Sequence, residues 1–254
     1  CRGGEGMSVA GKTVLITGGG SGVGADMAWQ FAEASARVII TGRRAEALDR
    51  VVSRHRAISP YAADVTDEEA VNALFKAAGP VDIVIANAGM AESAPLVKTS
   101  LDDWNRQIAV NLTGVFLTLR AGLAQMKGRE WGRLITVAST AGLKGYPYVA
   151  AYTAAKHGAV GLIRATAQET ARTGVTANAL CPGFLDTEMT ERSIANISEK
   201  TGMSAEEAKA RLVENNPQRR LIAPGEVSAA ALWLCAPGSE SINGQAIAID
   251  GGEI

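Results

Sequence analysis

Short apolar runs and longer amphipathic segments alternate along this chain of 254 residues. The apolar runs are almost unbroken, as in Val14-Leu15-Ile16, which is typical of strands buried on both faces of a parallel sheet. The pattern predicts strands at residues 13–17, 37–41, 58–62, 82–86, 133–138, 175–180 and 246–249. It predicts helices at residues 23–34, 45–54, 67–78, 101–127, 148–172 and 225–234. This order predicts an α/β fold, a doubly wound parallel sheet of about seven strands with helices on both faces.

Residues 186–216 interrupt the alternation, because this charged, Ala-rich and helix-forming segment is inserted between the sixth strand and the last helix. A chain that leaves the carboxyl edge of such a sheet and returns is well placed to cover a ligand crevice. We therefore expect a substrate lid; the alternative is a helical hairpin on the surface with no substrate role. Residues 1–6 are interpreted as an expression remnant or an extended start, and residues 7–254 as a single domain.

Composition narrows the class of protein. Hydrophobic residues make up 47% and charged residues 20%, as in soluble globular proteins, and the net charge of −1 gives no electrostatic reason to expect nucleic acid or an acidic membrane as partner. Cys1, Cys181 and Cys235 follow no disulfide or metal spacing, which favours a reducing, cytoplasmic location. We find no signal-peptide pattern and no apolar run of the ~18 residues that a membrane-spanning helix needs.

A glycine-rich turn follows the first predicted strand and leads directly into the first predicted helix. Glycines let a dinucleotide pyrophosphate approach the backbone, and the amino end of the helix offers free N–H groups and a positive dipole. The alternative, a merely tight turn, is disfavoured because both the strand and the helix are recognisable. The candidate binding residues are Gly18, Ser21, Gly22, Val23 and Gly24.

The end of the second strand indicates which dinucleotide binds. An NAD enzyme would place a carboxylate there, whereas this chain has Thr41-Gly42-Arg43-Arg44. Arg43, and with it Arg44, could bind a 2′-phosphate, so NADP(H) is favoured and NAD(H) remains possible. The alternative is that both arginines begin a solvated helix. Ser21 is not basic, so a 2′-phosphate would depend on this one cluster.

Two further strand ends carry candidate cofactor residues. Asp64-Val65 follows the third strand, where Asp64 could accept from the adenine amino group or cap the helix that starts near Asp67. The triplet Asn87-Ala88-Gly89 closes the fourth strand. Its small residues let a ribose lie close, and the Asn87 amide can bridge neighbouring strands, although the triplet alone is an ordinary turn signal.

Candidate catalytic chemistry lies at Ser139, Tyr152 and Lys156. Tyr152 and Lys156 are four residues apart, so they share one face of a helix. A lysine ammonium beside a phenol stabilises the phenolate, so we expect the Tyr152 pKa to fall from about 10 toward neutrality. Such a tyrosine can exchange a proton with a carbonyl or alcohol oxygen, which the Ser139 hydroxyl could hold.

These motifs together resemble those of the short-chain dehydrogenases/reductases over essentially residues 9–252, and their order and spacing make chance agreement negligible. The resemblance implies a Rossmann-type dinucleotide-binding catalytic domain and a homotetramer. The matching motifs are Thr-Gly-x-x-x-Gly-x-Gly at 17–24, Asp64-Val65, Asn87-Ala88-Gly89, Asn111, Ser139, Tyr-x-x-x-Lys at 152–156 and Pro182-Gly183.

The resemblance also assigns roles to individual residues. It implies a catalytic tetrad in which Tyr152 is the general acid/base, Ser139 orients the carbonyl and Lys156 holds the nicotinamide ribose. Asn111 would organise a water that links Lys156 to solvent; the alternative is a polar packing residue in a helix, where Asn has poor propensity. Thr187, after Pro182-Gly183, would bind the nicotinamide carboxamide, or it could simply start the lid helix.

The sequence indicates the substrate less directly. The resemblance places walls at residues 90–95, 141–149 and 186–216. These stretches, with the two residues just before the last one, offer a mainly apolar set of side chains: Met90, Leu143, Tyr146, Tyr148, Phe184, Leu185 and Met189. Arg192, Lys200 and Lys209 could meet an anionic carrier such as coenzyme A, or form a solvated face. Residues 171–184 are similar to 3-oxoacyl-thioester and polyketide ketoreductases, and the lid to 3-hydroxybutyrate and acetoacetyl-CoA dehydrogenases.

We therefore predict an oxidoreductase that transfers a hydride between NADP(H) and a ketone or secondary alcohol, with a 3-oxoacyl thioester or a related 3-oxo compound as substrate. One alternative is an NAD-dependent dehydrogenase for a hydroxy acid, steroid or aromatic alcohol. Another is a sensor or scaffold that binds the cofactor without turnover. No metal-ligand cluster is recognisable in the sequence, so no metal is expected.

Overall fold

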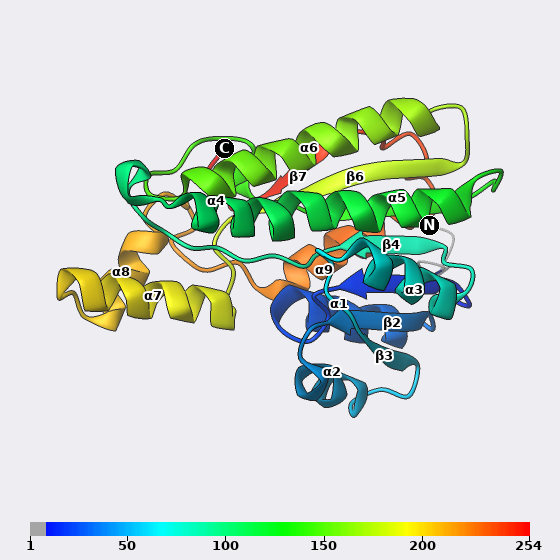
Figure 1. Cartoon of the computed structure of the whole chain (residues 1–254), viewed down its shortest axis with the longest axis horizontal. Coiled ribbons are helices and arrows are strands. Elements are labelled where there is room, and N and C mark those ends of the chain that lie inside the picture. The colour runs from blue at the N-terminus through cyan, green and yellow to red at the C-terminus, as the bar shows by residue number, and fades with distance from the viewer. Residues whose placement is uncertain (1–8) are drawn as a thin grey trace, which may run out of the picture.

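The computed structural model describes residues 9–254, in which seven parallel strands form one sheet in the order β3-β2-β1-β4-β5-β6-β7 (Figure 1). The interpretation of residues 1–6, Cys1 included, lies outside the described residues. The doubly wound α/β fold is confirmed, and every strand lies within two residues of its predicted bounds. The strands are β1 Thr13–Thr17, β2 Arg37–Gly42, β3 Ile58–Ala62, β4 Ile83–Ala86, β5 Gly132–Val137, β6 Val175–Pro182 and β7 Ala246–Ile249.

The helices follow the predicted pattern, with one notable difference at a start. The helix predicted over residues 148–172 begins at Ala150, because Tyr148 has a positive φ of 69° that a right-handed helix cannot include. The helices are α1 Gly22–Glu33, α2 Ala45–Val52, α3 Glu68–Ala78, α4 Leu101–Ile108, α5 Gly114–Met126, α6 Ala150–Thr170, α7 Glu188–Thr201, α8 Ala205–Leu212 and α9 Pro224–Trp233. Short helical turns are η1 Leu96–Lys98, η2 Ala109–Thr113 and η3 Thr140–Gly142.

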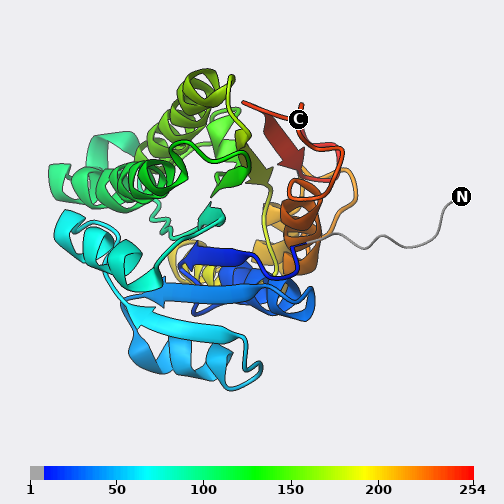
Figure 2. The same cartoon turned by 90° about the vertical axis from the view of Figure 1, so that its right-hand side faces the viewer.

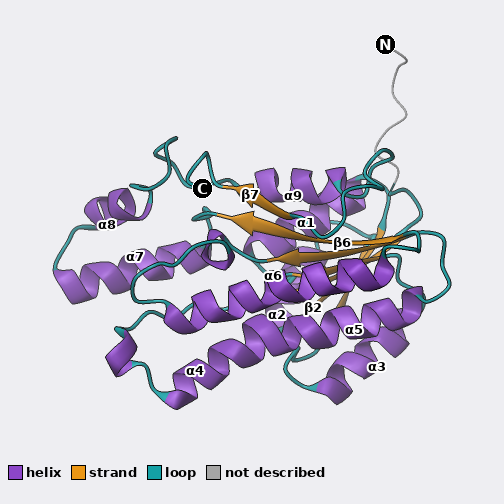
Figure 3. Cartoon of the chain, turned by 90° about the horizontal axis from the view of Figure 1, so that it is seen from above, coloured by secondary structure: helices purple, strands orange, loops and turns teal. Residues whose placement is uncertain are grey.

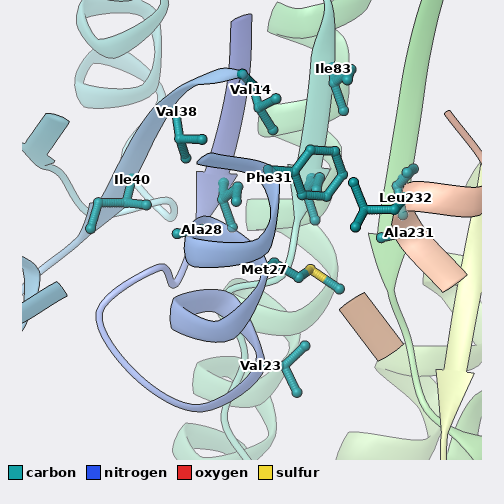
Figure 4. Packing of buried hydrophobic residues seen from close by; sticks show 14 of the residues in the cluster. Val14, Val23, Met27, Ala28, Phe31, Val38, Ile40, Ile83, Ala231 and Leu232 are labelled. Atoms are coloured by element: carbon teal, nitrogen blue, oxygen red, sulfur yellow. The ribbon is translucent and has the colours of Figure 1, made fainter. Parts of the chain in front are cut away.

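Two apolar clusters cover the two faces of the sheet, because successive residues of a strand point to opposite sides. Val14 and Ile16 pack with α1, α2 and α9 on one face, whereas Leu15 between them packs with α3, α5 and α6 on the other. Helices lie on both sides of the strands in Figure 2. Figure 4 shows Phe31 and Met27 of α1 directed between the strands and α9; both are fully buried. The parallel sheet is therefore enclosed on both faces, as the unbroken apolar runs predicted.

The helix predicted over residues 101–127 contains a wide turn. The residues Ala109–Thr113 form a π-helical segment, η2, between α4 and α5, with Asn111 at its centre. By length and composition alone, the continuous stretch Leu101–Met126 could cross a membrane, contrary to our expectation that no apolar run is long enough. However, 44% of its most apolar window is buried inside the fold, where α5 contacts β4 and β5. Core helices of soluble proteins reach the same length and composition, so this stretch is weak evidence for a membrane span.

The topology creates a crevice at the carboxyl edge of the sheet. The strand β1 lies between β2 and β4, so the chain after β1 and the chain after β4 diverge to opposite faces at this point. The segment predicted as a lid forms α7 and α8, which project from the same end of the domain (Figures 1 and 3). The fold thus brings the ends of the strands and the insertion together.

Candidate active site

The glycine-rich turn after β1 is packed so closely that side chains would not fit. Gly18 has a positive φ of 66°, and a Cβ atom on it would lie 2.8 Å from the Ala88 Cα. A Cβ atom on Gly24 would lie 2.3 Å from the Gly18 carbonyl oxygen. Real Cβ atoms do not approach backbone so closely, so these positions require glycine. The turn leads directly into the amino end of α1, where Ser21 makes no side-chain capping hydrogen bond, and this is the arrangement that binds a pyrophosphate.

Asn87 ties the end of β4 to this turn. Its side-chain amide donates to the backbone oxygens of Thr17, at 2.9 Å, and of Gly18, at 3.2 Å. In return, the Thr17 hydroxyl accepts from the backbone N–H groups of Asn87 and Ala88, each at 3.0 Å. The interpretation that the Asn87 amide bridges neighbouring strands is thereby confirmed. Four hydrogen bonds thus tie the ends of β1 and β4 together.

Ser21 and Thr187 face this turn with side chains that do not cap their helices. Ser21 is the N-cap residue of α1 and Thr187 that of α7, yet neither makes a side-chain capping hydrogen bond. The Thr187 methyl group lies 3.3 Å from the place where a Gly22 Cβ would stand. Thr187 therefore starts the first helix of the insertion, which was the alternative to a role in cofactor binding. It also lies against the glycine turn.

Arg43 and Arg44 follow β2 and are exposed. The backbone N–H of Gly19 donates to the Thr41 carbonyl oxygen at 3.1 Å, which holds the end of β2 beside the glycine turn. Arg44 is the N-cap residue of α2 but makes no side-chain capping hydrogen bond. Within residues 9–254, neither guanidinium forms an ion pair with a carboxylate. Both groups are free to meet a phosphate.

Asp64 does not cap the following helix. Asp67 is the N-cap of α3 and accepts from the backbone N–H groups of Glu69 and Ala70. Asp64 instead accepts from the backbone N–H and the hydroxyl of Thr66, at 2.9 and 2.8 Å, through one oxygen. Its neighbour Val65 is buried. The capping alternative is therefore wrong for Asp64, because the turn at Thr66 already satisfies that oxygen.

Ser139, Tyr152 and Lys156 lie together at the carboxyl ends of β5 and β6. Ser139 is the N-cap residue of η3, where its Oγ atom accepts from the Ala141 backbone N–H at 3.1 Å. The Ser139 side chain is close enough to Tyr152 to lower the pKa of its phenol. Lys156 is almost fully buried; its ammonium donates to the Val137 carbonyl at 2.9 Å and lies 5.5 Å from the centre of the Tyr152 ring. The tertiary structure thus gathers the three side chains that the sequence singled out.

The ionisation of this pair differs from our expectation. Burial raises the pKa of Tyr152 above its ordinary value, and only the nearby Ser139 side chain opposes the rise. Burial also lowers the pKa of Lys156 to about 8. The predicted fall of the Tyr152 pKa toward neutrality is therefore wrong in this geometry. The reason is that the Lys156 ammonium bonds to the Val137 carbonyl and not to the phenol. In addition, desolvation disfavours both the Tyr152 phenolate and the Lys156 ammonium.

Asn111 is held in one orientation by the backbone around it. It is completely buried; its amide donates to the carbonyl oxygens of Met90, at 2.8 Å, and Gln107, at 3.0 Å. Its oxygen accepts from the Met90 backbone N–H at 3.0 Å. A Cβ on Gly89 would lie 3.1 Å from that oxygen and 3.7 Å from the Lys156 ammonium. Asn111 thus lies beside Lys156, and the wide turn η2 accommodates a residue with poor helix propensity.

The turn after β6 closes the crevice from the other side. Pro182 ends that strand, and the Gly183 backbone N–H donates to the Ile249 carbonyl at 3.0 Å. Cys181 just before them is completely buried, and burial raises the pKa of its thiol to about 11. It is therefore a small core side chain and not a nucleophile. Within residues 9–254, no group of three or more His, Cys, Asp or Glu side chains could hold a metal ion.

The expected substrate walls are only partly available. Leu185 packs against the cluster that contains Ile222, and the Tyr146 hydroxyl is turned away into a hydrogen bond with Glu253 at 2.6 Å. Tyr148 and Phe184 stay exposed. A pocket beside Tyr148 is lined by the polar side chains of Glu92, Asp103 and Gln107 among others, so its lining is more polar than the predicted apolar wall. Glu253 and Gln107 belong to no motif, and sequence reasoning missed both.

Comparison with known proteins agrees with this geometry. The model of the short chain dehydrogenase family matches residues 12–198. A D-beta-hydroxybutyrate dehydrogenase of Cupriavidus necator is 36% identical over 251 residues, 95% of this chain and 97% of the relative. A 3-oxoacyl-(acyl-carrier-protein) reductase of Aquifex aeolicus is 31% identical over 97% of this chain and 98% of the relative. A solved structure of an actinorhodin polyketide ketoreductase variant with NADPH superposes with a TM-score of 0.90 at 32% identity, covering 96% of this chain and 97% of that one.

Proposed function

The chain belongs to the short-chain dehydrogenase family, and we propose that it transfers a hydride reversibly between NADP(H) and a 3-oxoacyl thioester or a related 3-oxo compound. As a member of that family it is an oxidoreductase that acts on alcohol and ketone groups. The observation that carries the proposal is the grouping of Ser139, Tyr152 and Lys156 at the same sheet edge as the glycine turn, with the Lys156 ammonium 5.5 Å from the centre of the Tyr152 ring.

The residues of the crevice fit a dinucleotide. A Cβ atom would fill the space at Gly18 and Gly24, so the backbone there is open to a close ligand. The side chains of Ser21 and Thr187 are not used in capping, and Arg43 and Arg44 are exposed beside the turn. Further candidate contacts are Gly22, Val23, Asp64, Val65, Asn87, Ala88, Gly89, Pro182 and Gly183. The actinorhodin ketoreductase variant was solved with NADPH, which agrees with the preference.

The nicotinamide, when bound, supplies or accepts the hydride, and the side chains of this chain manage the proton. Because its pKa is raised, Tyr152 keeps its proton at neutral pH and can donate it to the oxygen of a ketone that is being reduced. Ser139, whose side chain lies beside Tyr152, would hold the same oxygen. Lys156, with a pKa of about 8, would exchange its proton readily, and Asn111 would orient the route to solvent. This protonation state supplies the proton that reduction of a ketone consumes.

The substrate class rests on the relatives and on the insertion. The Aquifex relative is named for 3-oxoacyl substrates and the Cupriavidus relative for a 3-hydroxy acid. Both named substrates therefore carry an oxygen atom on carbon 3. Arg192, Lys200 and Lys209 are exposed on α7 and α8, where they could attract the phosphates of a carrier. The insertion would then act as a lid over the substrate.

A hydroxy acid with NAD(H) is the second candidate, since the 36% relative is named for D-beta-hydroxybutyrate. We further propose a homotetramer, supported by Leu101 and Phe116, which are exposed on the long helical stretch, and a cytoplasmic location, supported by the free, buried Cys181 and Cys235. No nucleic acid or membrane partner is proposed.

One spectrophotometric panel tests these candidates. The absorbance of NADPH and of NADH is followed with acetoacetyl-CoA, longer 3-oxoacyl thioesters, simple ketones and hydroxy acids, with Tyr152→Phe as the blank. Thioester reduction that favours NADPH supports the proposal. Preference for NADH refutes the assignment of Arg43, and turnover on hydroxy acids alone refutes the substrate. Cofactor binding without turnover on any compound would favour the sensor.

A further inference from the structure

The segment after β7, residues 250–254, carries a buried carboxylate that no motif singled out. The side chain of Glu253 is only 4% exposed. A buried charge is costly unless it is paired. Here Glu253 Oε1 accepts from the Tyr146 hydroxyl at 2.6 Å and lies 2.9 Å from the Lys144 ammonium. Glu253 is therefore paired entirely with residues of the loop between η3 and α6.

This pairing continues to the catalytic serine. The Thr140 hydroxyl lies 2.8 Å from the Tyr146 hydroxyl, in position to donate to it while Tyr146 donates to Glu253. Thr140 is the first residue of η3, and Ser139 is the N-cap residue of that turn. The Lys144 ammonium also lies 5.0 Å from the centre of the Tyr146 ring. The orientation of η3, and with it the direction of the Ser139 hydroxyl, thus depends on groups that Glu253 holds.

The same segment contacts two other parts of the site. A Cβ on Gly183 would lie 3.6 Å from Glu253 Oε2, so the carboxylate reaches the turn after β6. A Cβ on Gly251 would lie 2.3 Å from the Asn216 side-chain oxygen, so the segment packs tightly against the end of the insertion. Asp250 accepts from the backbone N–H groups of Gly252, at 2.9 Å, and Ile254, at 3.0 Å, which keeps the segment folded. Figure 3 shows the chain end on the side where α7 and α8 project.

We propose that Glu253 is a positioning residue, which holds the substrate loop (residues 140–147) against the sheet edge and so directs Ser139 at the reacting oxygen. Glu253 acts through Tyr146 and Thr140 and does not itself exchange a proton with the substrate. The kinetic consequence rests on the proposed function, whereas the ordering of the substrate loop does not. Removing the carboxylate releases the loop while leaving the nucleotide cradle of β1 and α1 intact.

Kinetics of four variants test the proposal. Glu253→Ala is expected to lower kcat for ketone reduction by about 10- to 100-fold, the usual effect of misplacing a group by about 1 Å, with little change in nucleotide affinity. Glu253→Gln keeps an acceptor oxygen for Tyr146 and is expected to retain most of kcat. Tyr146→Phe should lower kcat by a similar factor. Combining it with Glu253→Ala should lower kcat no further, because both substitutions break the same hydrogen bond between Tyr146 and Glu253.

The matched control is Asp82→Ala. Asp82 is also a partly buried carboxylate, which pairs with Arg129 at 3.1 Å and accepts from the Thr13 backbone N–H, but it lies at the amino end of the sheet. Its loss should lower stability without lowering kcat. An equal loss of kcat in Asp82→Ala and Glu253→Ala would overturn the proposal, because general destabilisation would then explain both.

Amide hydrogen exchange separates this proposal from the proposed function. In Glu253→Ala, exchange should accelerate in residues 140–147 and stay unchanged in α1, whether or not any ketone of the panel is reduced. Such acceleration supports the positioning role even if every thioester fails and the proposed substrate is abandoned. Unchanged exchange in residues 140–147 refutes the role of Glu253, even if the enzyme reduces thioesters well.

Discussion

Replacing Arg43 with alanine tests the choice between NADP(H) and NAD(H). The residue follows β2, whose end is tied to the glycine turn by the bond from the Gly19 N–H to the Thr41 carbonyl. Arg43 is exposed and forms no ion pair with a carboxylate in the described part of the chain, so no protein group competes for its guanidinium. Removing the Arg43 side chain should therefore weaken the binding only of a nucleotide that carries a 2′-phosphate.

The size of the effect follows from the exposure of the side chain. Hydrogen bonds to charged groups contribute about 1.5–3 kcal/mol each, which corresponds to roughly 10- to 150-fold in affinity. Because Arg43 is exposed and its charge is screened by salt, we expect the lower part of this range, about 10- to 30-fold. Affinity for NADH, which lacks the 2′-phosphate, should change by less than about 2-fold.

The assay is a titration of each nucleotide by protein fluorescence at low and high salt. Arg50→Ala is the control, since Arg50 is an exposed arginine on α2 whose loss changes the charge equally. The reasoning is refuted if Arg43→Ala weakens NADPH and NADH equally, or if Arg50→Ala weakens NADPH as much as Arg43→Ala does. If NADPH binds Arg43→Ala as tightly as wild type, the two arginines do not bind the 2′-phosphate and simply begin a solvated helix.

Three other variants test the site and the core. Gly24→Ala should abolish tight nucleotide binding, because its Cβ would lie 2.3 Å from the Gly18 oxygen, whereas Gly161→Ala on α6, with nothing within 4 Å, should bind normally in the same titration. Phe31→Ala should lower the free energy of unfolding in urea by about 3–5 kcal/mol, because Phe31 is completely buried; Phe116→Ala, 40% exposed, should cost clearly less. The pKa of Lys156 is lowered to about 8 in the folded protein, so the unfolded chain binds more protons between pH 8 and its ordinary value near 10.5. Wild type should therefore gain stability over Lys156→Met as pH rises through that window, by about 3 kcal/mol; a difference that is flat or falls with pH contradicts the burial argument.

Local pattern predicted most of the fold. The run Val14-Leu15-Ile16 indicated a strand buried on both sides, and the structure places Leu15 in one cluster and its two neighbours in the other. The glycine turn was predictable because its constraints lie within a few residues, as at Gly24, which approaches Gly18. The shared helical face of Tyr152 and Lys156 follows from their spacing alone. The family resemblance supplied Asn111 and Thr187, which no local pattern identifies.

Features that depend on distant neighbours could not be predicted. The wide turn around Asn111 and the left-handed backbone of Tyr148 depend on packing against other segments, so the helix bounds there were missed. The direction of the Tyr152 pKa shift was missed too, because it depends on how deeply the fold buries the phenol and where the Lys156 ammonium bonds.

The sequence by itself thus determined the strand–helix order, the glycine turn and the residue types of the active site, because these depend on periodicity and on steric limits between near neighbours. Only the tertiary structure decided how those residues are held and ionised. Glu253 bonds to Tyr146 across 107 positions of chain, and no periodicity connects them. Burial and long-range pairing arise when the sheet brings strand ends together, so the desolvation and the contacts that tune the site exist only in the folded protein.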